Sequence, residues 1–404
     1  MLKYPEMLDI SAEYISLSES EYLKLKTPLA NINVNITLTL ENGESVLAPS
    51  YLTLMNEVGP GKGGLRIHKN VTAEEVQGLA GLMEIKCRIT ELPFSGAKSG
   101  ICIDAEKLTQ KDYQKLIFLY AETYKPILIP RNKKYYYITA CDVNSRPWMM
   151  SQIVRHMGDY QCATSKDPLD GGIKGRPPAT GYGVANITKH YIEEILKEDI
   201  KGKTIGIQGF GNVGSWTARY LHDMGAKIVA ITDFYGGTYD ENGINIPDLL
   251  RYVSTSKSNS VSGFKGDITN EKLLAGSFDV LIPAALEDQI TELNANKIEA
   301  KLIVSAANGP ITQRGQEILT DRGIEIIPGI ANAGGVIASN FELMSAGDPK
   351  VVRIEDVQEY INKKQISNFE DIIKLSKDFK VNLFIAEIIL AIQRRLEILR
   401  AIGF

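Results

Sequence analysis

Two lysines lie in glycine-rich segments that let other groups come close to them. Lys62 stands within residues 59–64 (GPGKGG), and Lys98 stands within residues 93–100 (PFSGAKSG). Glycines allow the backbone to bend tightly and to be approached closely. Because neighbouring lysines repel each other and burial penalises their charge, one of them can become neutral and act as a base. These segments therefore favour a site for anion binding and proton transfer.

A third lysine, Lys86, lies on the apolar side of an expected helix over residues 72–91. Thr72 and Glu75 form a capping-box pattern at the start of this helix. At about 100° per residue, Lys86 projects inside the apolar arc centred near Val76. The residues expected on the opposite, polar face are Gln77, Glu84, Arg88 and Glu91. A lysine on the buried face either meets an anion or extends its charged end past the edge of the core, and the helix alone favours neither.

Asp142 is the candidate anion for Lys86. It lies in residues 139–145 (TACDVNS), after the strand-like run YYYIT. A carboxylate beside a lysine that acts as a base can shuttle protons. The alternative is an ordinary turn aspartate, which sequence statistics alone favour because aspartate is common in turns.

Residues 209–214 (GFGNVG) follow the strand-like run TIGIQ and open a helix, which is the context that a dinucleotide-binding GxGxxG turn requires. The first glycine makes the turn, the second lets the backbone approach a pyrophosphate, and the third lets helix and strand pack closely. The helix N-terminus supplies N–H groups to the phosphates. The residues expected to bind the dinucleotide here are Gly209, Gly211, Asn212, Val213 and Gly214. A glycine-rich turn without a ligand is the alternative.

The next strand-like run, KIVAIT, ends at Asp233. The spacing from Gly214 is 233 − 214 = 19 residues, close to the about 20 expected for the acid that binds ribose hydroxyls. The charge of Asp233 would repel a 2′-phosphate. The sequence therefore slightly favours NAD over NADP.

The elements around these motifs indicate an α/β fold. Strands are expected over residues 32–40, 203–208, 227–232, 279–283, 302–305 and 324–327, and helices over 184–198, 212–224 and 379–400. Alternating strands and helices predict a parallel sheet with crossover helices. A Gly/Pro-rich stretch at 158–179 predicts a domain boundary. We expect residues 1–178, with a returning C-terminal helix at 370–404, to form a substrate and oligomerisation domain, and residues 179–369 to form a Rossmann-like dinucleotide domain.

Bulk composition excludes several function classes. The chain has 404 residues, a formal net charge of -4 and four cysteines. This balance disfavours nucleic-acid binding, and no apolar run is long enough to span a membrane. The absence of a CxxC pair and the scarcity of histidine disfavour a metal site, and the cysteines and N-terminus fit a reducing cytoplasm.

The ordered motifs resemble the glutamate/leucine/phenylalanine/valine dehydrogenase family, and most closely its glutamate dehydrogenases. The resemblance runs from about residue 30 to the C-terminus. It rests on GPGKGGLRIH, LMEIK, LPFSGAKSGI, ACDVNS, GGIKGRPPATGYGV, GFGNVG, PAALEDQI, AANGP and NAGGVIAS. The lysine spacings, 86 − 62 = 24 and 98 − 86 = 12, also match.

The resemblance implies a role for each matching residue. Lys86 would bind the α-carboxylate of glutamate, Lys98 would activate water, and Asp142 would shuttle protons. Lys62 and Ser339 would bind the side-chain carboxylate. The remaining residues implied in the substrate site are Met83 and Val336, and those implied at the dinucleotide are Thr180, Ala284, Asn308 and Asn332. The implied substrates are glutamate or 2-oxoglutarate and ammonia with NAD or NADP, and the implied assembly is a homohexamer without metal.

The chain departs from the family pattern around its chemical residues. Ser95 and Ser99 replace glycines of the Lys98 segment, Cys141 replaces a proline, and residues 341–345 read FELMS where a Phe-Glu-Trp motif is usual. Changes in supporting residues can weaken a site without removing it. These changes keep open a non-catalytic paralogue that binds nucleotide or glutamate and regulates a catalytic partner. The other alternative, a dehydrogenase for another amino acid, is disfavoured because it would need something other than a carboxylate to meet Lys62 and Ser339.

Overall fold

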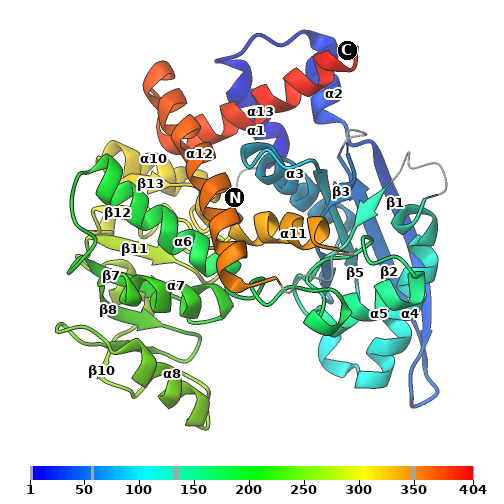
Figure 1. Cartoon of the computed structure of the whole chain (residues 1–404), viewed down its shortest axis with the longest axis horizontal. Coiled ribbons are helices and arrows are strands. Elements are labelled where there is room, and N and C mark those ends of the chain that lie inside the picture. Colours follow the sequence, from blue (N-terminus) through cyan, green and yellow to red (C-terminus); the bar gives the residue numbers. More distant parts are fainter. Residues whose placement is uncertain (1–2, 56–58, 131–135, 347–351, 404) are drawn as a thin grey trace. The chain divides into compact units, whose positions relative to one another are not determined.

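The computed structural model describes residues 3–55, 59–130, 136–346 and 352–403. The chain forms two compact units (Figure 1). The terminal unit comprises Lys3–Arg176, Ala338–Asp356 and Ala391–Phe404, and the central unit comprises Pro177–Ile337 and Val357–Leu390. The compact units thus change over at 176–177, within the Gly/Pro-rich stretch. The ranges that we expected for the two domains assign 338–356 and 370–390 differently, and they stay a prediction.

The terminal unit is built on one mixed sheet. Its strands are β1 (Ala30–Thr39), β2 (Ser45–Leu54), β3 (Gly61–Lys62), β4 (Leu65–Ile67), β5 (Ser95–Ile101) and β6 (Tyr137–Ile138), in the order β1-β2-β5-β3-β6 with β4 beside β5. The β1–β2 and β2–β5 pairs are antiparallel, whereas β3 and β4 run parallel to β5. The strand expected at 32–40 is β1, which extends further at its start.

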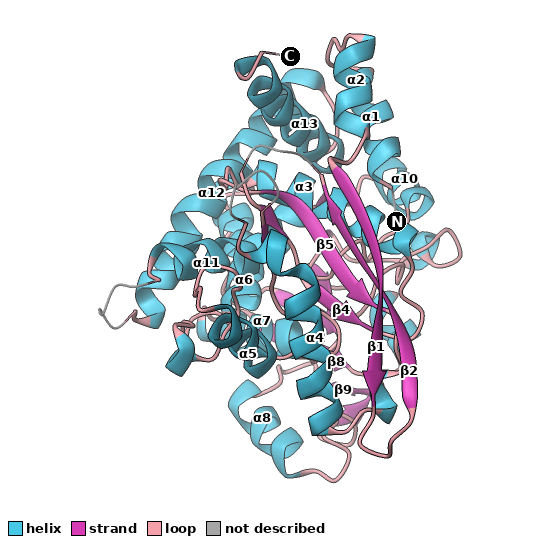
Figure 2. Cartoon of the chain, turned by 90° about the vertical axis from the view of Figure 1, so that its right-hand side faces the viewer, coloured by secondary structure: helices cyan, strands magenta, loops and turns pink. Residues whose placement is uncertain are grey.

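Helices cover both faces of β5, and every residue of this strand is buried. The helices of the unit are α1 (Tyr4–Ala12), α2 (Glu19–Lys26), α3 (Ala73–Ile89), α4 (Gln110–Leu128) and α5 (Pro147–Met157). Figure 2 shows α4 in front of the sheet, beside β1. Gly96 lies against α3, where an added Cβ would come within 2.3 Å of the Ala80 carbonyl oxygen. Ala97 and Ile101 instead join the core cluster that contains residues of α4 and α5.

Two expectations about α3 need correction. Thr72 does cap the helix by accepting from the Glu75 N–H, but the Glu75 carboxylate binds Arg66 instead of completing a capping box. Glu84 and Arg88, expected on a polar face, are buried. They form an ion pair with each other, and the Glu84 carboxylate also accepts from the Gly96 N–H. The periodicity argument failed because α3 is packed on more than one side.

The C-terminal helices divide between the units. α12 (Ile354–Phe379) precedes α13 (Leu383–Ala401), so the last helix begins four residues later than expected, 383 − 379 = 4. The last part of α13 returns to the terminal unit, where Arg394 donates to the carbonyl oxygens of Arg88 and Ile89 at 3.2 and 3.0 Å. The fully buried Arg395 hydrogen-bonds to the Tyr4 hydroxyl. These contacts tie α13 to α3 and α1.

The central unit is a Rossmann-like sheet. Its strands are β7 (Thr204–Gln208), β8 (Lys227–Thr232), β9 (Gly237–Tyr239), β10 (Gly266–Asp267), β11 (Val280–Pro283), β12 (Leu302–Val304) and β13 (Glu325–Ile327), in the order β10-β9-β8-β7-β11-β12-β13. The five strands from β8 to β13 along this order are parallel. Four of the expected strands are β7, β8, β11 and β12, and the run at 324–327 is β13. The chain order reverses beside β7, which marks the point where open α/β sheets bind ligands.

The helices of the central unit are α6 (Ala179–His190), α7 (Asn212–Asp223), α8 (Ile246–Thr255), α9 (Asn270–Leu274) and α10 (Gln313–Asp321), and α11 (Gly334–Met344) begins in it. α6 starts five residues before the expected helix at 184–198, 184 − 179 = 5, and continues as a π-helical turn over Tyr191–Ile195. None of the helices in the described part of the chain is both long and apolar enough to cross a membrane.

Candidate active site

A buried lysine and a half-buried aspartate form an ion pair in the terminal unit. Lys98, on β5, places its Nζ atom 2.6 Å from the Asp142 Oδ1 atom. Arg66, on β4, donates from Nε to the other carboxylate oxygen of Asp142 at 2.9 Å. Lys98 is only 5% exposed. Asp142 is therefore no ordinary turn aspartate, although its described ion pairs are with Lys98 and Arg66 and not with Lys86, the partner that we expected.

Neighbouring charges set the protonation of this pair. Burial alone would raise the pKa of Asp142, but Lys98 and Arg66 outweigh it and hold that pKa well below its ordinary value. Burial lowers the pKa of Lys98, and the attraction of Asp142 only partly opposes this effect. The pair thus combines a carboxylate that stays charged with a lysine that releases its proton more easily than a lysine in water.

Lys62 lies on β3, in a separate cationic environment. It is 2% exposed, and burial lowers its pKa to about 7, with a smaller effect in the same direction from Arg176. Ser339, on α11, accepts a hydrogen bond from the Arg176 Nε atom at 3.2 Å. Arg176 therefore links the two residues that we expected to bind a side-chain carboxylate, because it contacts one and acts electrostatically on the other.

A buried ion pair fixes the loop before Arg176. Lys166 Nζ lies 2.7 Å from the Glu342 carboxylate, and both side chains are fully buried. The same carboxylate accepts the Ser165 and Lys166 backbone N–H groups at 2.9 and 3.4 Å. Ser165 adopts a φ of 65°, in the left-handed region. The Glu342 bonds hold this bent segment in place, so FELMS retains a structural glutamate at its second position.

The other expected substrate residues show different degrees of burial. Lys86 and Met83 are half-buried on α3. Val336 is buried in α11 and belongs to the central unit, whereas Ser339 belongs to the terminal unit. Their assignment to a shared substrate site stays a prediction.

The glycine turn of the central unit has the geometry expected for a dinucleotide. Gly209 has a φ of 94°, and its N–H donates to the Thr232 carbonyl at 2.8 Å. A Cβ on Gly214 would lie 1.9 Å from the Gly209 carbonyl oxygen, whereas a Cβ on Gly211 would meet nothing within 4 Å. Asn212 and Val213 open α7. Gly214 is thus required by helix–strand packing. Gly211 leaves open space at a helix N-terminus, which is where phosphate oxygens bind in such turns.

Asp233 has more contacts than the sequence pattern indicates. Its Oδ1 atom accepts from the Ser260 hydroxyl and from the Tyr235 N–H, both at 2.9 Å, and its Oδ2 atom accepts from the Val261 N–H at 2.7 Å. The carboxylate therefore holds the loop around residue 260. The next residue, Phe234, is 94% exposed.

Four further residues were expected at the dinucleotide. Thr180 lies in the first turn of α6. The Ala284 carbonyl oxygen lies against Gly209, since a Cβ added to Gly209 would lie 2.8 Å from this oxygen. Asn308 is exposed after β12, and the buried Asn332 donates to the carbonyl oxygens of Ser305 and Ala307 at 3.1 and 3.0 Å. Asn332 thus also braces the segment that carries Asn308.

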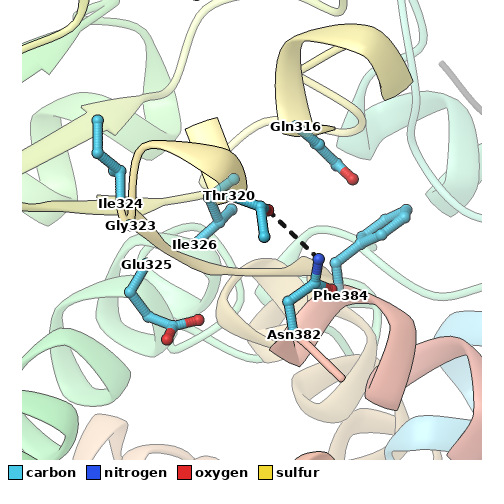
Figure 3. A pocket seen from close by; sticks show the side chains of 8 residues that line it. All are labelled: Gln316, Thr320, Gly323, Ile324, Glu325, Ile326, Asn382 and Phe384. Carbon is cyan, nitrogen blue, oxygen red and sulfur yellow. Dashed lines mark hydrogen bonds between the residues drawn. The ribbon is translucent and has the colours of Figure 1, made fainter. Parts of the chain in front are cut away.

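A cavity elsewhere in the central unit has a volume of about 110 Å³. It is lined by Gln316, Thr320, Gly323, Ile324, Glu325, Ile326, Asn382 and Phe384, and Figure 3 shows the Asn382 amide hydrogen-bonded to Thr320. The residues that line it include none of those expected to bind substrate or dinucleotide. We therefore assign it no part in the site.

Comparisons with known proteins identify the family of this chain. The family model for the Glutamate/Leucine/Phenylalanine/Valine dehydrogenase matches residues 171–403, and the model for the dimerisation domain of the same family matches residues 28–159. The chain belongs to the Glu/Leu/Phe/Val dehydrogenase family. It therefore carries the fold of a nicotinamide-dependent amino-acid dehydrogenase together with the dimerisation domain of that family.

Relatives of this dehydrogenase match it over nearly the whole chain. A cryptic catabolic NAD-specific glutamate dehydrogenase of Bacillus subtilis is 36% identical over 97% of this chain and 93% of its own length. An NADP-specific glutamate dehydrogenase of Synechocystis is 34% identical over 98% of this chain and 95% of its own length.

Solved structures confirm the two-domain α/β fold. A glutamate dehydrogenase from Peptoniphilus asaccharolyticus has a TM-score of 0.85 at 28% identity, covering 99% of this chain and 98% of that chain. A hetero-hexameric glutamate dehydrogenase from Thermus thermophilus has a TM-score of 0.90 at 23% identity, covering 99% and 96%.

Sequence reasoning missed several residues of the candidate site. Arg66, Arg176, Lys166 and Glu342 are the charged side chains that the structure adds around the lysines. Arg66 and Arg176 lie within motifs already noted, GGLRIH and KGRPPA, so proximity to those glycines was the available signal. Lys166 and Glu342 are 176 residues apart in sequence, 342 − 166 = 176, and no local pattern connects them.

Proposed function

We propose that this dehydrogenase catalyses the reversible oxidative deamination of L-glutamate to 2-oxoglutarate and ammonia with NAD or NADP. The ion pair of Lys98 and Asp142, 2.6 Å apart, carries this proposal. A lysine whose pKa is lowered by burial can accept a proton from water, and the adjacent carboxylate can receive or return one. The relatives named as glutamate dehydrogenases support the same reaction.

In the proposed reaction, the substrate amine first loses a proton through Asp142. A bound dinucleotide would accept the hydride from the α-carbon, and the nitrogen lone pair would form the imine. Lys98 takes a proton from water as the oxygen attacks the imine carbon. Lys98 then gives this proton to the carbinolamine nitrogen, the C–N bond breaks with release of ammonia, and the hydroxyl oxygen forms the carbonyl as its proton passes to Lys98. Oxidation of the α-carbon thus balances reduction of the dinucleotide.

The choice of glutamate rests on the cations around Lys62. The groups that act on its charge include Arg176 and Lys166, which are cationic, and one carboxylate, Glu342. The excess positive charge favours a substrate with a second carboxylate, which Lys62 and Ser339 would bind. Lys86 would bind the α-carboxylate, and Met83 and Val336 would contact the carbon chain. An apolar substrate would leave Lys62 and Arg176 without a substrate carboxylate.

The dinucleotide would bind on the glycine turn of the central unit. The open space beside Gly211 and the N-terminus of α7 suit a pyrophosphate, and Ala284, Thr180, Asn308 and Asn332 would contact the rest of the dinucleotide. Asp233 slightly favours NAD, because its charge would lie near the ribose. The NAD-specific and NADP-specific relatives have nearly equal sequence identity to this chain, 36% and 34%.

We further propose a homohexamer that works in the cytoplasm. The match to the dimerisation domain and the similar fold of the hetero-hexameric enzyme from Thermus thermophilus support assembly. The four cysteines are free, in keeping with a reducing compartment.

The test is an absorbance assay at 340 nm with purified protein. Glutamate, leucine and phenylalanine are each offered with NAD and with NADP. The matched pair of variants is Lys98→Ala and Lys107→Ala, since Lys107 also pairs with an aspartate but is 80% exposed. Glutamate-dependent reduction that disappears only in Lys98→Ala is the expected result. Lack of turnover with every pair, in protein that binds dinucleotide, would overturn the proposal and favour the regulatory paralogue.

A further inference from the structure

The face of β5 opposite Lys98 carries a buried chain of hydroxyl groups. Successive residues of a strand point to opposite faces, so Ser99 points away from the face that carries Lys98. Its Oγ atom lies 2.9 Å from the Tyr120 hydroxyl, on α4, and 2.9 Å from the Tyr137 hydroxyl, on β6. The Tyr137 hydroxyl donates in turn to the Gly63 carbonyl oxygen at 3.0 Å. All three side chains are completely buried.

The chain has one direction of donation. The Gly63 carbonyl oxygen, at 3.0 Å, is nearer to the Tyr137 hydroxyl than the Thr139 Oγ1 atom, at 3.4 Å, so we assign the single proton of Tyr137 to Gly63. Ser99 must then donate to Tyr137, and Tyr120 must donate to Ser99. Burial raises the pKa of Tyr137 to about 12 and that of Tyr120 well above its ordinary value, so both phenols keep their protons. The order Tyr120, Ser99, Tyr137, Gly63 therefore uses each of these three hydroxyl donors once.

The end of this chain lies directly beside Lys62. Gly63 follows Lys62 and is pressed against β5, since a Cβ there would lie 1.7 Å from the Ala97 carbonyl oxygen. The Ser99 N–H donates to the Gly64 carbonyl at 3.2 Å. Tyr137, on β6, therefore connects the segment that carries Lys62 to β5, which carries Lys98. The chain after β6 leads to Asp142.

We infer that Ser99, Tyr137 and Tyr120 are positioning residues that fix Lys62 relative to Lys98 through the Gly63 carbonyl. A hydroxyl at position 99, where the family resemblance leads us to expect glycine, thus has a function: it bonds to both phenols. The expected effect on glutamate binding rests on the proposed function. The hydrogen-bonded connection from Ser99 through Tyr137 to Gly63, called the tether below, does not.

The experiment compares Tyr137→Phe with Tyr124→Phe. Tyr124 lies on α4 and is 1% exposed, and its hydroxyl bonds to Ser50 at 3.0 Å, outside the chain. Hydrogen–deuterium exchange of residues 61–65 is measured in the protein without ligand. We expect about tenfold faster exchange in Tyr137→Phe and no change in Tyr124→Phe, because only the former frees the Gly63 carbonyl. Equal exchange in the two variants would overturn the inference.

Steady-state kinetics provide the second readout. We expect the KM for glutamate to rise about tenfold in Tyr137→Phe while kcat stays within about twofold, since displacement of a binding group weakens substrate binding. Ser99→Ala, which keeps the Tyr137–Gly63 bond, should change KM in the same direction by a smaller factor, and it replaces Tyr137→Phe if that variant does not fold. Faster exchange in a protein whose wild type shows no turnover would support the tether and reject the proposed function. An unchanged KM in an active enzyme would reject the positioning role.

Discussion

Around Lys98, the terminal unit buries charged side chains that already contact partners, whereas at Gly209–Gly214 the central unit offers backbone groups and open space. Lys98, Asp142 and Arg66 form ion pairs at 2.6 and 2.9 Å. The region around Gly211 has no atom within 4 Å of an added Cβ. The first region depends on side-chain charge, and the second depends on the absence of a side chain. Substitutions should therefore act through protonation in one and through steric fit in the other.

The largest effect is expected from removing the base. Lys98→Ala should lower kcat by about 10³- to 10⁴-fold, because general base catalysis contributes a factor of this order. Asp142 would then keep Arg66 as a partner, so the fold should survive. Dinucleotide affinity, measured by fluorescence titration, should stay unchanged. A kcat within tenfold of wild type would show that Lys98 is not the base.

Steric effects in the central unit come next. Gly214→Ala should weaken dinucleotide binding by more than about 100-fold or prevent folding of the unit, because its Cβ would lie 1.9 Å from the Gly209 carbonyl oxygen. Gly211→Ala should leave the melting temperature unchanged, since its Cβ meets no atom, and should weaken dinucleotide binding by about tenfold. Calorimetry and titration measure the two quantities. Equal loss of stability in both variants would contradict the assignment of Gly214 to packing and of Gly211 to dinucleotide binding.

The terminal unit should show a dependence on pH that the central unit lacks. The pKa of Lys62 is lowered to about 7 by burial, so Lys62 is charged below this pH and becomes neutral as the pH rises through it. Affinity for 2-oxoglutarate should therefore fall by up to about tenfold per pH unit above 7. 2-Oxovalerate, which lacks the second carboxylate, is the matched control in calorimetric titrations. The same slope for both acids, or a slope that persists in Lys62→Met, would contradict this assignment.

The smallest effect is expected at Asp233. Asp233→Asn should reduce the preference for NAD over NADP by about fivefold, because it removes a negative charge near the 2′ position. It should also loosen the loop at Ser260 and Val261, since an amide group cannot accept at both ends. The ratio of kcat/KM values for the two dinucleotides measures the first effect. An unchanged ratio would assign Asp233 to loop support alone.

Local sequence was sufficient where a motif works through its own backbone. The turn at Gly209–Gly214 lies between a strand and a helix, and two of its glycines are explained within that segment: Gly209 by its φ of 94°, and Gly214 by its contact with the Gly209 carbonyl oxygen. Five parallel strands could likewise be located because strands buried on both faces form short apolar runs. The lysine motifs were also found, since glycine beside a lysine is a local signal.

Tertiary structure decided which charges meet. Asp142 pairs with Lys98 and Arg66, and periodicity along α3 placed Glu84 and Arg88 on the wrong face. Such pairings depend on segments far apart in sequence, as with Lys166 and Glu342 or Tyr137 and Gly63. A side chain's charge state depends on how completely the fold removes it from water and on which charges the fold places within a few ångströms. The sequence therefore specified the chemical groups and the dinucleotide turn, while the tertiary structure determined their partners and protonation.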